Sequence, residues 1–247
     1  MTSLPVLAVT GLAKEARLAA GPGVVAIGAG GDPQRLRRLL DARGPAGCRA
    51  VVSIGIAGGL DPSLQPGDVV VASGVLVDGR RYRLDAHIAE ALRRRLSDLR
   101  AGPKPGLRVI AADLAGVDAA VLTVDGKVAL HARTGAAAVD MESHVAAEFA
   151  ARHGLPFAAI RVVCDPAGRA LPAFVAHALK PDGEPDILAV LRALARRQVT
   201  VGGLIRLARD SGTAFAALGR CRTLLGFGLG IPELAGSRLE TEKPRSA

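Results

Sequence analysis

Short apolar runs alternate with amphipathic stretches along this chain, and the alternation predicts a sheet flanked by helices. Strand-like runs lie at residues 4–10, 23–27, 50–54, 68–72, 75–77, 107–111, 119–124 and 157–164. The last run, FAAIRVVC, is apolar on both faces apart from one arginine, as expected of a buried parallel strand. The repeated strand–helix pattern predicts a single α/β domain with a central twisted, mostly parallel or mixed sheet.

The segment from Thr134 to Gly168 carries two carboxylates at positions where a purely structural role is unusual. Apolar residues recur every three to four positions from residue 141 to about 153, which predicts an amphipathic helix with Asp140 as its N-cap. Glu142 then projects on the apolar side of the first helical turn. Asp165 follows the buried strand at its carboxyl end, where ligands bind in open α/β sheets. The two carboxylates can therefore share one cleft.

Two motifs in the chain resemble the purine nucleoside phosphorylase/methylthioadenosine nucleosidase superfamily. One is the acidic–Met–Glu segment VDMES at residues 139–143. The other is VVSIGIAGGLDPSLQPGDVVVA at residues 51–72, with a Gly-x-Ala-Gly-Gly-Leu element followed by Gly-Asp-Val-Val. The motifs occur in the expected order, and the resemblance covers residues 5–166. Within the superfamily the sequence is similar to the hopanoid-associated nucleoside phosphorylase family, which implies an enzyme that removes adenine from adenosylhopane.

The resemblance implies a role for each of five residues around a nucleoside. Glu142 would bind the 2′,3′-diol of the ribose, because an ionised carboxylate accepts two hydrogen bonds. Met141 would pack on the sugar, and Ala57 and Gly58 would lie against the nucleoside. Asp165 would contact the base, since a protonated carboxyl has one donor and one acceptor, which match N6–H₂ and N7 of adenine. It would also protonate N7 as general acid, which requires burial to hold the proton at neutral pH.

Each of these acidic residues also has a purely structural interpretation. Asp165 with Pro166 can form a turn after the strand, and Glu142 can be an ordinary first-turn glutamate. Met141 can likewise be a core residue. The combination of both carboxylates with the glycine motif favours the functional interpretation.

The loops that follow the first two predicted strands are candidates for activating or binding the group that attacks the sugar, water or phosphate. In the sequence GLAKEA the resemblance implies that Glu15 activates a water molecule; an exposed carboxylate favoured by the helix dipole is the alternative. Gly28, Gly30 and Gly31 form a second loop, and in the phosphorylases this region contributes to the phosphate site. Backbone N–H groups in such a loop can hold an anion, although a tight strand-to-helix turn explains the glycines equally well.

The sequence departs from the superfamily pattern at two places. Ile56 stands where several phosphorylases carry an anion-binding serine, and Val52 or Ser53 stands where they carry an arginine. The co-substrate, inorganic phosphate or water, therefore stays open, and no other cofactor is expected. Lys127 occupies the position of an aromatic base-stacking residue of the nucleosidases, so a lysine stem would cover the base instead.

Composition restricts the class of protein further. The 247 residues are 49% hydrophobic, which suits one domain with a sizeable core. The five histidines and three cysteines show no metal-ligand spacing and no disulfide pattern, so we expect no metal and a cytoplasmic location. A net charge of +9 indicates an anionic partner, but one Tyr, five Phe and no Trp leave little to stack on bases, so no nucleic acid is expected.

Residues 1–168 form the predicted nucleoside phosphorylase-like core, and residues 169–247 form a basic helical extension of the same domain. Apolar and arginine positions repeat with helical spacing over residues 187–197, 204–209 and 215–229, ahead of a polar tail at 240–247. Such helices can lie in a membrane interface or pack on the core or a sister subunit. A lipid 5′ substituent on the substrate would suit peripheral contact with the inner membrane, and the resemblance implies a homo-oligomer.

The sequence thus predicts a purine nucleoside phosphorylase or nucleosidase that releases adenine from a 5′-substituted adenosine, with adenosylhopane as the substrate that the resemblance implies. One alternative is a methylthioadenosine/adenosylhomocysteine nucleosidase. The other is a catalytically impaired, membrane-associated nucleoside-binding protein.

Overall fold

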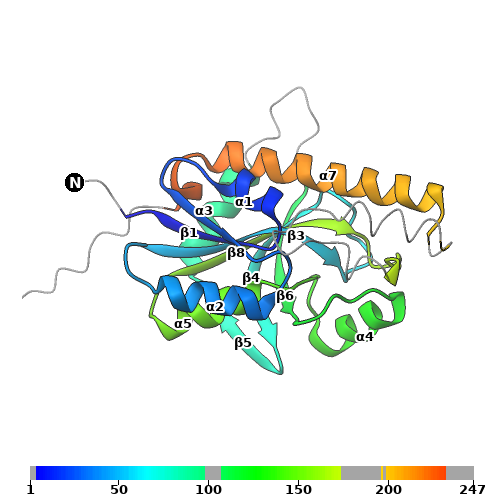
Figure 1. Ribbon diagram of the computed structural model, residues 1–247, viewed down its shortest axis with the longest axis horizontal. Helices are drawn as coiled ribbons and strands as arrows, with labels where there is room; N and C mark the ends of the chain where they lie inside the picture. Colours follow the sequence, from blue (N-terminus) through cyan, green and yellow to red (C-terminus); the bar gives the residue numbers. More distant parts are fainter. Residues whose placement is uncertain (1–3, 98–106, 174–195, 197–198, 232–247) are drawn as a thin grey trace, which may run out of the picture.

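Strand β8 (Phe157–Asp165) lies in the middle of a mixed sheet, between β3 (Ala50–Gly59) and β4 (Val69–Val77) (Figure 1). The computed structural model describes residues 4–97, 107–173, 196 and 199–231. Every residue of β8 is buried, because helices cover both faces of the sheet at this strand. The apolar run at 157–164 is therefore confirmed as a buried strand, parallel to β3.

The other strands are β1 (Val6–Thr10), β2 (Val24–Gly28), β5 (Arg80–Arg83), β6 (Val109–Gly116) and β7 (Ala138–Asp140). β3 pairs in parallel with β1 and β8, and antiparallel with β7. β4 pairs antiparallel with β8 and β5 and in parallel with β6, which in turn pairs with β7. Strands β3, β8, β4, β6 and β7 thus close into a ring that brings the ends of β3, β7 and β8 together.

Helices cover the two faces of the sheet (Figure 1). On one face lie α2 (Pro33–Arg43) and α5 (Ser143–Arg152), and on the other α1 (Ala13–Ala19), α3 (Ala86–Ser97) and α7 (Val201–Leu225). Leu36 and Phe149 belong to the first core layer, and Leu92 and Leu218 to the second. Burying such a side chain contributes about 1.5–3 kcal/mol, so both layers hold the sheet in place. The predicted single α/β domain with a mixed sheet flanked by helices is confirmed.

Two local predictions are wrong. Residues 119–123 form a loop rather than a strand, and α4 (Val124–Thr134) follows it. The hydroxyl of Thr123 accepts a hydrogen bond from the backbone N–H of Gly126 at 3.0 Å, an N-cap that overrides the β-propensity of the neighbouring valines. Helix α5 begins at Ser143, because Asp140 is the last residue of β7 rather than a helix cap.

Part of the C-terminal region lies outside the described residues, including the basic apolar segment predicted at 187–197, apart from residue 196, and the tail at 240–247. The second half of α7 packs on the sheet through Ala214, Leu218 and Leu225 and continues into a short 3₁₀ helix, η3 (Phe227–Gly230). The first turns of α7 instead expose Val201 and Ile205. Among the described helices, none is long and apolar enough to cross a membrane.

Candidate active site

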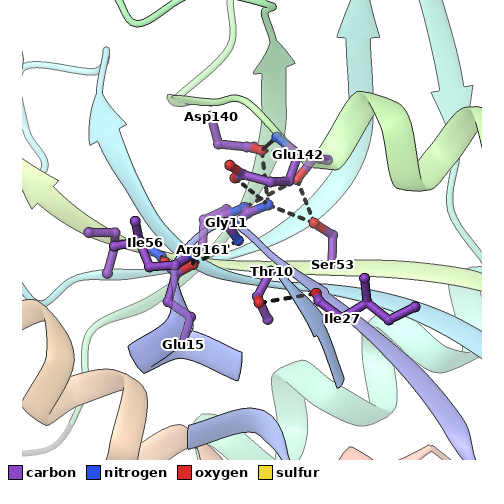
Figure 2. Close-up of polar contacts among 11 residues, drawn as sticks. Thr10, Gly11, Glu15, Ile27, Ser53, Ile56, Asp140, Glu142 and Arg161 are labelled. Carbon is purple, nitrogen blue, oxygen red and sulfur yellow. Dashed lines mark hydrogen bonds and ion pairs between the residues drawn. The ribbon is translucent and has the colours of Figure 1, made fainter. Parts of the chain in front are cut away.

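A fully buried arginine on β8 is the centre of a polar cluster (Figure 2). Nη2 of Arg161 lies 2.6 Å from Oγ of Ser53, 2.9 Å from Oδ1 of Asp140 and 3.4 Å from Oε2 of Glu142. Its Nε donates to Oγ of Ser143 at 3.2 Å. Because a buried charge is costly without partners, this network explains how an arginine fits inside an apolar strand.

The turn between β7 and α5 aims Glu142 at this arginine. Oδ1 of Asp140 accepts the backbone N–H groups of Glu142 at 2.8 Å and Ser143 at 2.6 Å. These bonds satisfy N–H groups at the start of α5, which would otherwise lack a partner. Asp140 thus stabilises the turn into α5 as the last residue of β7, and not as the N-cap residue predicted for it, a position that Glu142 occupies. Met141 is half-buried between the two acidic residues.

Glu15 reaches the same cluster from the start of α1, and the structure places it in the interior rather than on an exposed helix turn. Its Oε2 accepts the backbone N–H groups of Gly11 at 2.9 Å and Leu12 at 2.7 Å, and its Oε1 accepts that of Ile56 at 2.7 Å. Three backbone donors fix the carboxylate of Glu15 at the loop after β1.

Gly55 allows Glu15 and Arg161 to approach one another. A Cβ atom at position 55 would lie 2.6 Å from Oε1 of Glu15 and 2.5 Å from Nη1 of Arg161. Both distances are below normal contact, so any side chain at position 55 would displace one of the two charged groups. The first glycine of the VSIGIAGG motif, Gly55, is thus required by the polar cluster itself.

Burial raises the pKa of two carboxyl groups in this cluster, those of Glu142 and Glu15. Burial raises the pKa of Glu142 to about 8, with Asp140 and Glu15 adding to the effect and Arg161 opposing it. Burial also raises the pKa of Glu15, against the influence of Arg161 and the three backbone N–H groups. A cluster of this kind can accept a proton near neutral pH and favours a positive charge brought beside it.

Asp165 lies at the end of β8 and contacts Lys127 of α4. The side chain of Lys127 is fully buried, and its Nζ donates a hydrogen bond to Oδ2 of Asp165. Nζ also donates to the carbonyl oxygens of Pro166 and Arg169, both at 3.0 Å. Burial raises the pKa of Asp165, while Lys127 and Arg169 oppose the rise. The ammonium of Lys127 thus lies at the side of Asp165 and is held there by the following loop.

Strand β3 runs between the polar cluster around Arg161 and the pair formed by Asp165 and Lys127. Gly58 pairs with Val139 of β7 and with Asp165 of β8, and a Cβ atom at position 58 would lie 3.2 Å from Oδ2 of Asp165. Gly55, beside the Arg161 cluster, is three residues earlier, which is roughly 10 Å along a strand. Ala57 is buried between them. The site therefore has an acidic cluster at one end and Asp165 at the other.

The glycine loop predicted to hold phosphate is arranged differently from an open anion site. Gly30 and Gly31 have positive φ angles of 72° and 76°, which glycine tolerates. Their backbone N–H groups donate to the carbonyl oxygen of Gly11 at 2.7 and 3.2 Å. The loop after Gly28 thus supports the loop that carries Glu15. Within the described residues, no group of three or more His, Cys, Asp or Glu side chains is placed to hold a metal ion.

Sequence reasoning found Glu15, Glu142 and Asp165 but missed the arginine that joins the first two. A signal was present, because a charged residue inside a run such as FAAIRVVC needs buried partners if both faces of the strand are covered. Ser53 and Ser143 carried no comparable signal, since a buried serine is compatible with many environments.

The chain matches a known protein family over most of its length. Residues 6–199 match the sequence profile of the Phosphorylase superfamily. No curated protein matches the chain in sequence.

Solved structures with a similar fold include several nucleosidases. The 5′-methylthioadenosine/S-adenosylhomocysteine nucleosidase from Neisseria meningitidis, in complex with methylthio-immucillin-A, has a TM-score of 0.63 and 17% identity, over 89% of this chain and 96% of that one. The corresponding nucleosidase from Colwellia psychrerythraea, in complex with adenine, has a TM-score of 0.57 and 19% identity, over 86% and 96%. Futalosine hydrolase of Helicobacter pylori has a TM-score of 0.61 and 13% identity, over 87% and 96%. At these identities the likeness establishes the fold.

Proposed function

The chain belongs to the phosphorylase superfamily, and from this premise we propose that it cleaves the N-glycosidic bond of a 5′-substituted adenosine with water and releases adenine. The observation that carries the proposal is the placement of buried carboxyl groups at both ends of the Gly55–Gly58 segment. The carboxyl of Glu15 lies beside Gly55, and that of Asp165 lies beside Gly58. A glycosidic bond is cleaved in this way when an acid protonates the leaving group on one side and a base activates water on the other.

Asp165 is the proposed general acid. The C1′–N9 bond breaks with its electron pair moving onto the base, and the proton of Asp165 moves to N7, so that adenine leaves neutral. Burial of Asp165 favours the protonated form that this step needs. A protonated carboxyl also complements the N6–H₂ and N7 edge of adenine, whereas a 6-oxopurine presents two acceptors there.

Glu142 and its neighbours are proposed to act on the ribose. With a pKa of about 8, Glu142 in the free enzyme can offer one donor and one acceptor to the 2′,3′-diol. When the glycosidic bond breaks, the sugar becomes oxocarbenium-like and positively charged. A positive charge on the sugar favours the ionised form of Glu142, and the carboxylate then stabilises the transition state electrostatically.

Water is the nucleophile that we favour over phosphate. Glu15 is held by three backbone N–H groups beside Arg161, and its raised pKa makes it a stronger base toward a bound water. A phosphate would have to enter beside several carboxylates, with the N–H groups of Gly30 and Gly31 already engaged by Gly11. Glu15 would take one proton of the water as its oxygen bonds to C1′.

The 5′ substituent defines which adenosine derivative the protein would cleave. We favour adenosylhopane, on the sequence resemblance and on the exposed Val201 and Ile205 beside Arg206 and Arg209 in the first turns of α7, a pattern that suits peripheral contact with a membrane. Methylthioadenosine or adenosylhomocysteine is the second candidate, because nucleosidases named for these substrates share the fold.

The test is adenine release from adenosylhopane in detergent, and from methylthioadenosine and adenosylhomocysteine, with and without inorganic phosphate. We expect release that does not depend on phosphate, that falls about a hundred- to ten-thousandfold in Asp165→Asn, and that is also lost in Glu15→Gln. Release that requires phosphate would refute hydrolysis. If the corresponding inosine analogues released hypoxanthine while the adenosine substrates released no adenine, the base assignment would be refuted, and no release from any nucleoside would refute the proposed function.

A further inference from the structure

The ammonium of Lys127 has all of its donors engaged by one short segment of the chain. Its three acceptors are Oδ2 of Asp165 and the carbonyl oxygens of Pro166 and Arg169. An ammonium has three N–H donors, so this arrangement satisfies the group without solvent. The lysine side chain is 0% exposed, and the cation is therefore a fixed part of the site rather than a mobile surface charge.

The carboxyl of Asp165 has few other charges around it among the described residues. Arg169 acts on it from the following loop, but its guanidinium is part-exposed and pairs with Asp210 of α7. Cys164 precedes it, and its thiol contacts the hydroxyl of Ser211 at 3.5 Å. On the β3 and β7 sides, Gly58 and Val139 bring no charge. Lys127 is thus the one buried cation that contacts Asp165 in the described part of the chain.

Proton transfer changes the charge of this pair in a specific way. Before the transfer, a protonated Asp165 beside an ammonium carries one positive charge. After the proton has moved to the base, the remaining carboxylate and the ammonium form a neutral, hydrogen-bonded ion pair. A buried carboxylate without this partner would be costly, so the cation favours the product side of the transfer.

We infer that Lys127 is a positioning residue for Asp165: it holds Oδ2, leaves Oδ1 to the base, and strengthens Asp165 as an acid by neutralising the carboxylate that forms. The inference rests on the proposed function, because it assigns a partner to the proposed general acid. Lys127 does not touch the base in this arrangement, and its proton stays on Nζ throughout the step. The bond that breaks at the enzyme is the O–H bond of Asp165, and the bond that forms is N7–H of the leaving adenine.

Two substitutions separate this role from simple anchoring of the loop. Lys127→Gln removes the charge but keeps two N–H donors for the carbonyl oxygens, whereas Lys127→Arg keeps the charge. An opposite charge in contact lowers a carboxyl pKa by about 1–3 units, so in Lys127→Gln we expect the alkaline limb of the kcat–pH profile to move up by that amount. We expect the plateau of kcat to fall by about ten- to a hundredfold, less than in Asp165→Asn. Lys127→Arg should restore the position of the limb, and Arg169→Gln should move it less than Lys127→Gln.

A second measurement does not depend on activity. Titration of the Asp165 carboxyl by ¹³C NMR, with the signal assigned by its loss in Asp165→Asn, should give a higher pKa in Lys127→Gln than in the wild-type protein. An unchanged carboxyl pKa, or a uniform loss of kcat with an unmoved alkaline limb, would overturn the inference and leave Lys127 as a loop anchor. If the wild-type protein released no base from any nucleoside, the proposed function would fail, and the NMR titration would still decide whether Lys127 acidifies Asp165.

Discussion

A Cβ atom on Gly11 would lie 2.5 Å from Oε1 of Glu142, so the loop after β1 and the start of α5 fit together only because residue 11 has no side chain. Gly11 also donates its N–H to Glu15 and its carbonyl oxygen accepts from Gly30 and Gly31. One glycine therefore connects the proposed ribose-binding carboxylate, the proposed base and the glycine loop.

Gly11→Ala should displace Glu142 and lower activity more than stability. Inserting a methyl group into a packed site typically costs about 1–3 kcal/mol, which the fold can tolerate, while a displaced Glu142 would no longer meet the diol. We expect kcat/KM for the best nucleoside substrate to fall at least about tenfold. Gly219→Ala is a suitable control, because position 219 lies in α7 with nothing within 4 Å of an added Cβ, and alanine favours the helix. Equal activity in the two variants would contradict the placement of Glu142 in the site.

Arg161→Met should destabilise the protein strongly. It leaves the buried carboxylates of Asp140 and Glu142 without their cation, and removing one partner of a buried ion pair costs about 3–5 kcal/mol. Chemical denaturation should show this loss at pH 8 and a smaller loss at pH 5, where Glu142 is protonated in the folded state.

Arg152→Met provides the matched control for that substitution. Arg152 pairs with Asp41 at 3.0 Å on the surface, with more than half of each side chain exposed. Exposed pairs contribute about 0–1 kcal/mol, so the control should unfold nearly as the wild-type protein does. Similar stability of the two variants would show that the interior cluster does not depend on Arg161.

Glu142 should make the protein less stable as pH rises. Its pKa of about 8 in the folded state lies above its ordinary value of 4.5, so between these pH values the folded state binds a proton that the unfolded state has lost. Its contribution to stability is therefore fully present below about pH 4.5 and decreases by up to about 1.4 kcal/mol per pH unit until about pH 8. Denaturation of wild type and Glu142→Gln from pH 5 to 8 checks this: the difference between them should narrow or reverse with rising pH, and a constant difference would contradict the buried, protonated Glu142.

Ile205→Glu should weaken contact with membranes. Ile205 is 62% exposed on the first turns of α7, next to Arg206, and a carboxylate there would oppose both apolar insertion and attraction to anionic lipid. We expect reduced co-sedimentation with phosphatidylglycerol vesicles and unchanged cleavage of any small soluble substrate. Val128→Glu is the control, since Val128 is 58% exposed on α4. If wild type does not bind these vesicles, or both variants bind alike, membrane contact through α7 is refuted.

Much of the architecture could be predicted from local sequence. The run at 157–164 contains only residues that suit a strand covered on both faces, apart from Arg161, and Asp32-Pro33 carries the signature of the helix start that α2 has. Residues 119–124 could not be predicted in this way, because a valine-rich stretch and a helix N-terminus differ there only in whether Thr123 caps the turn.

For the site, the sequence by itself determined which chemical groups are present, and that Glu15 follows the first strand and Asp165 follows the buried run at 157–164. The short strand β7 ahead of Glu142 was not predicted. Tertiary structure alone decided their partners. Arg161 meets Ser53, 108 residues earlier in the chain, because the register of β3 against β8 sets them on the same face. Lys127 meets Asp165 because α4 docks beside the end of β8. The physical reason is that local propensity depends on neighbouring residues, whereas the pairing of buried charges depends on strand register and helix docking, which only the packed core fixes.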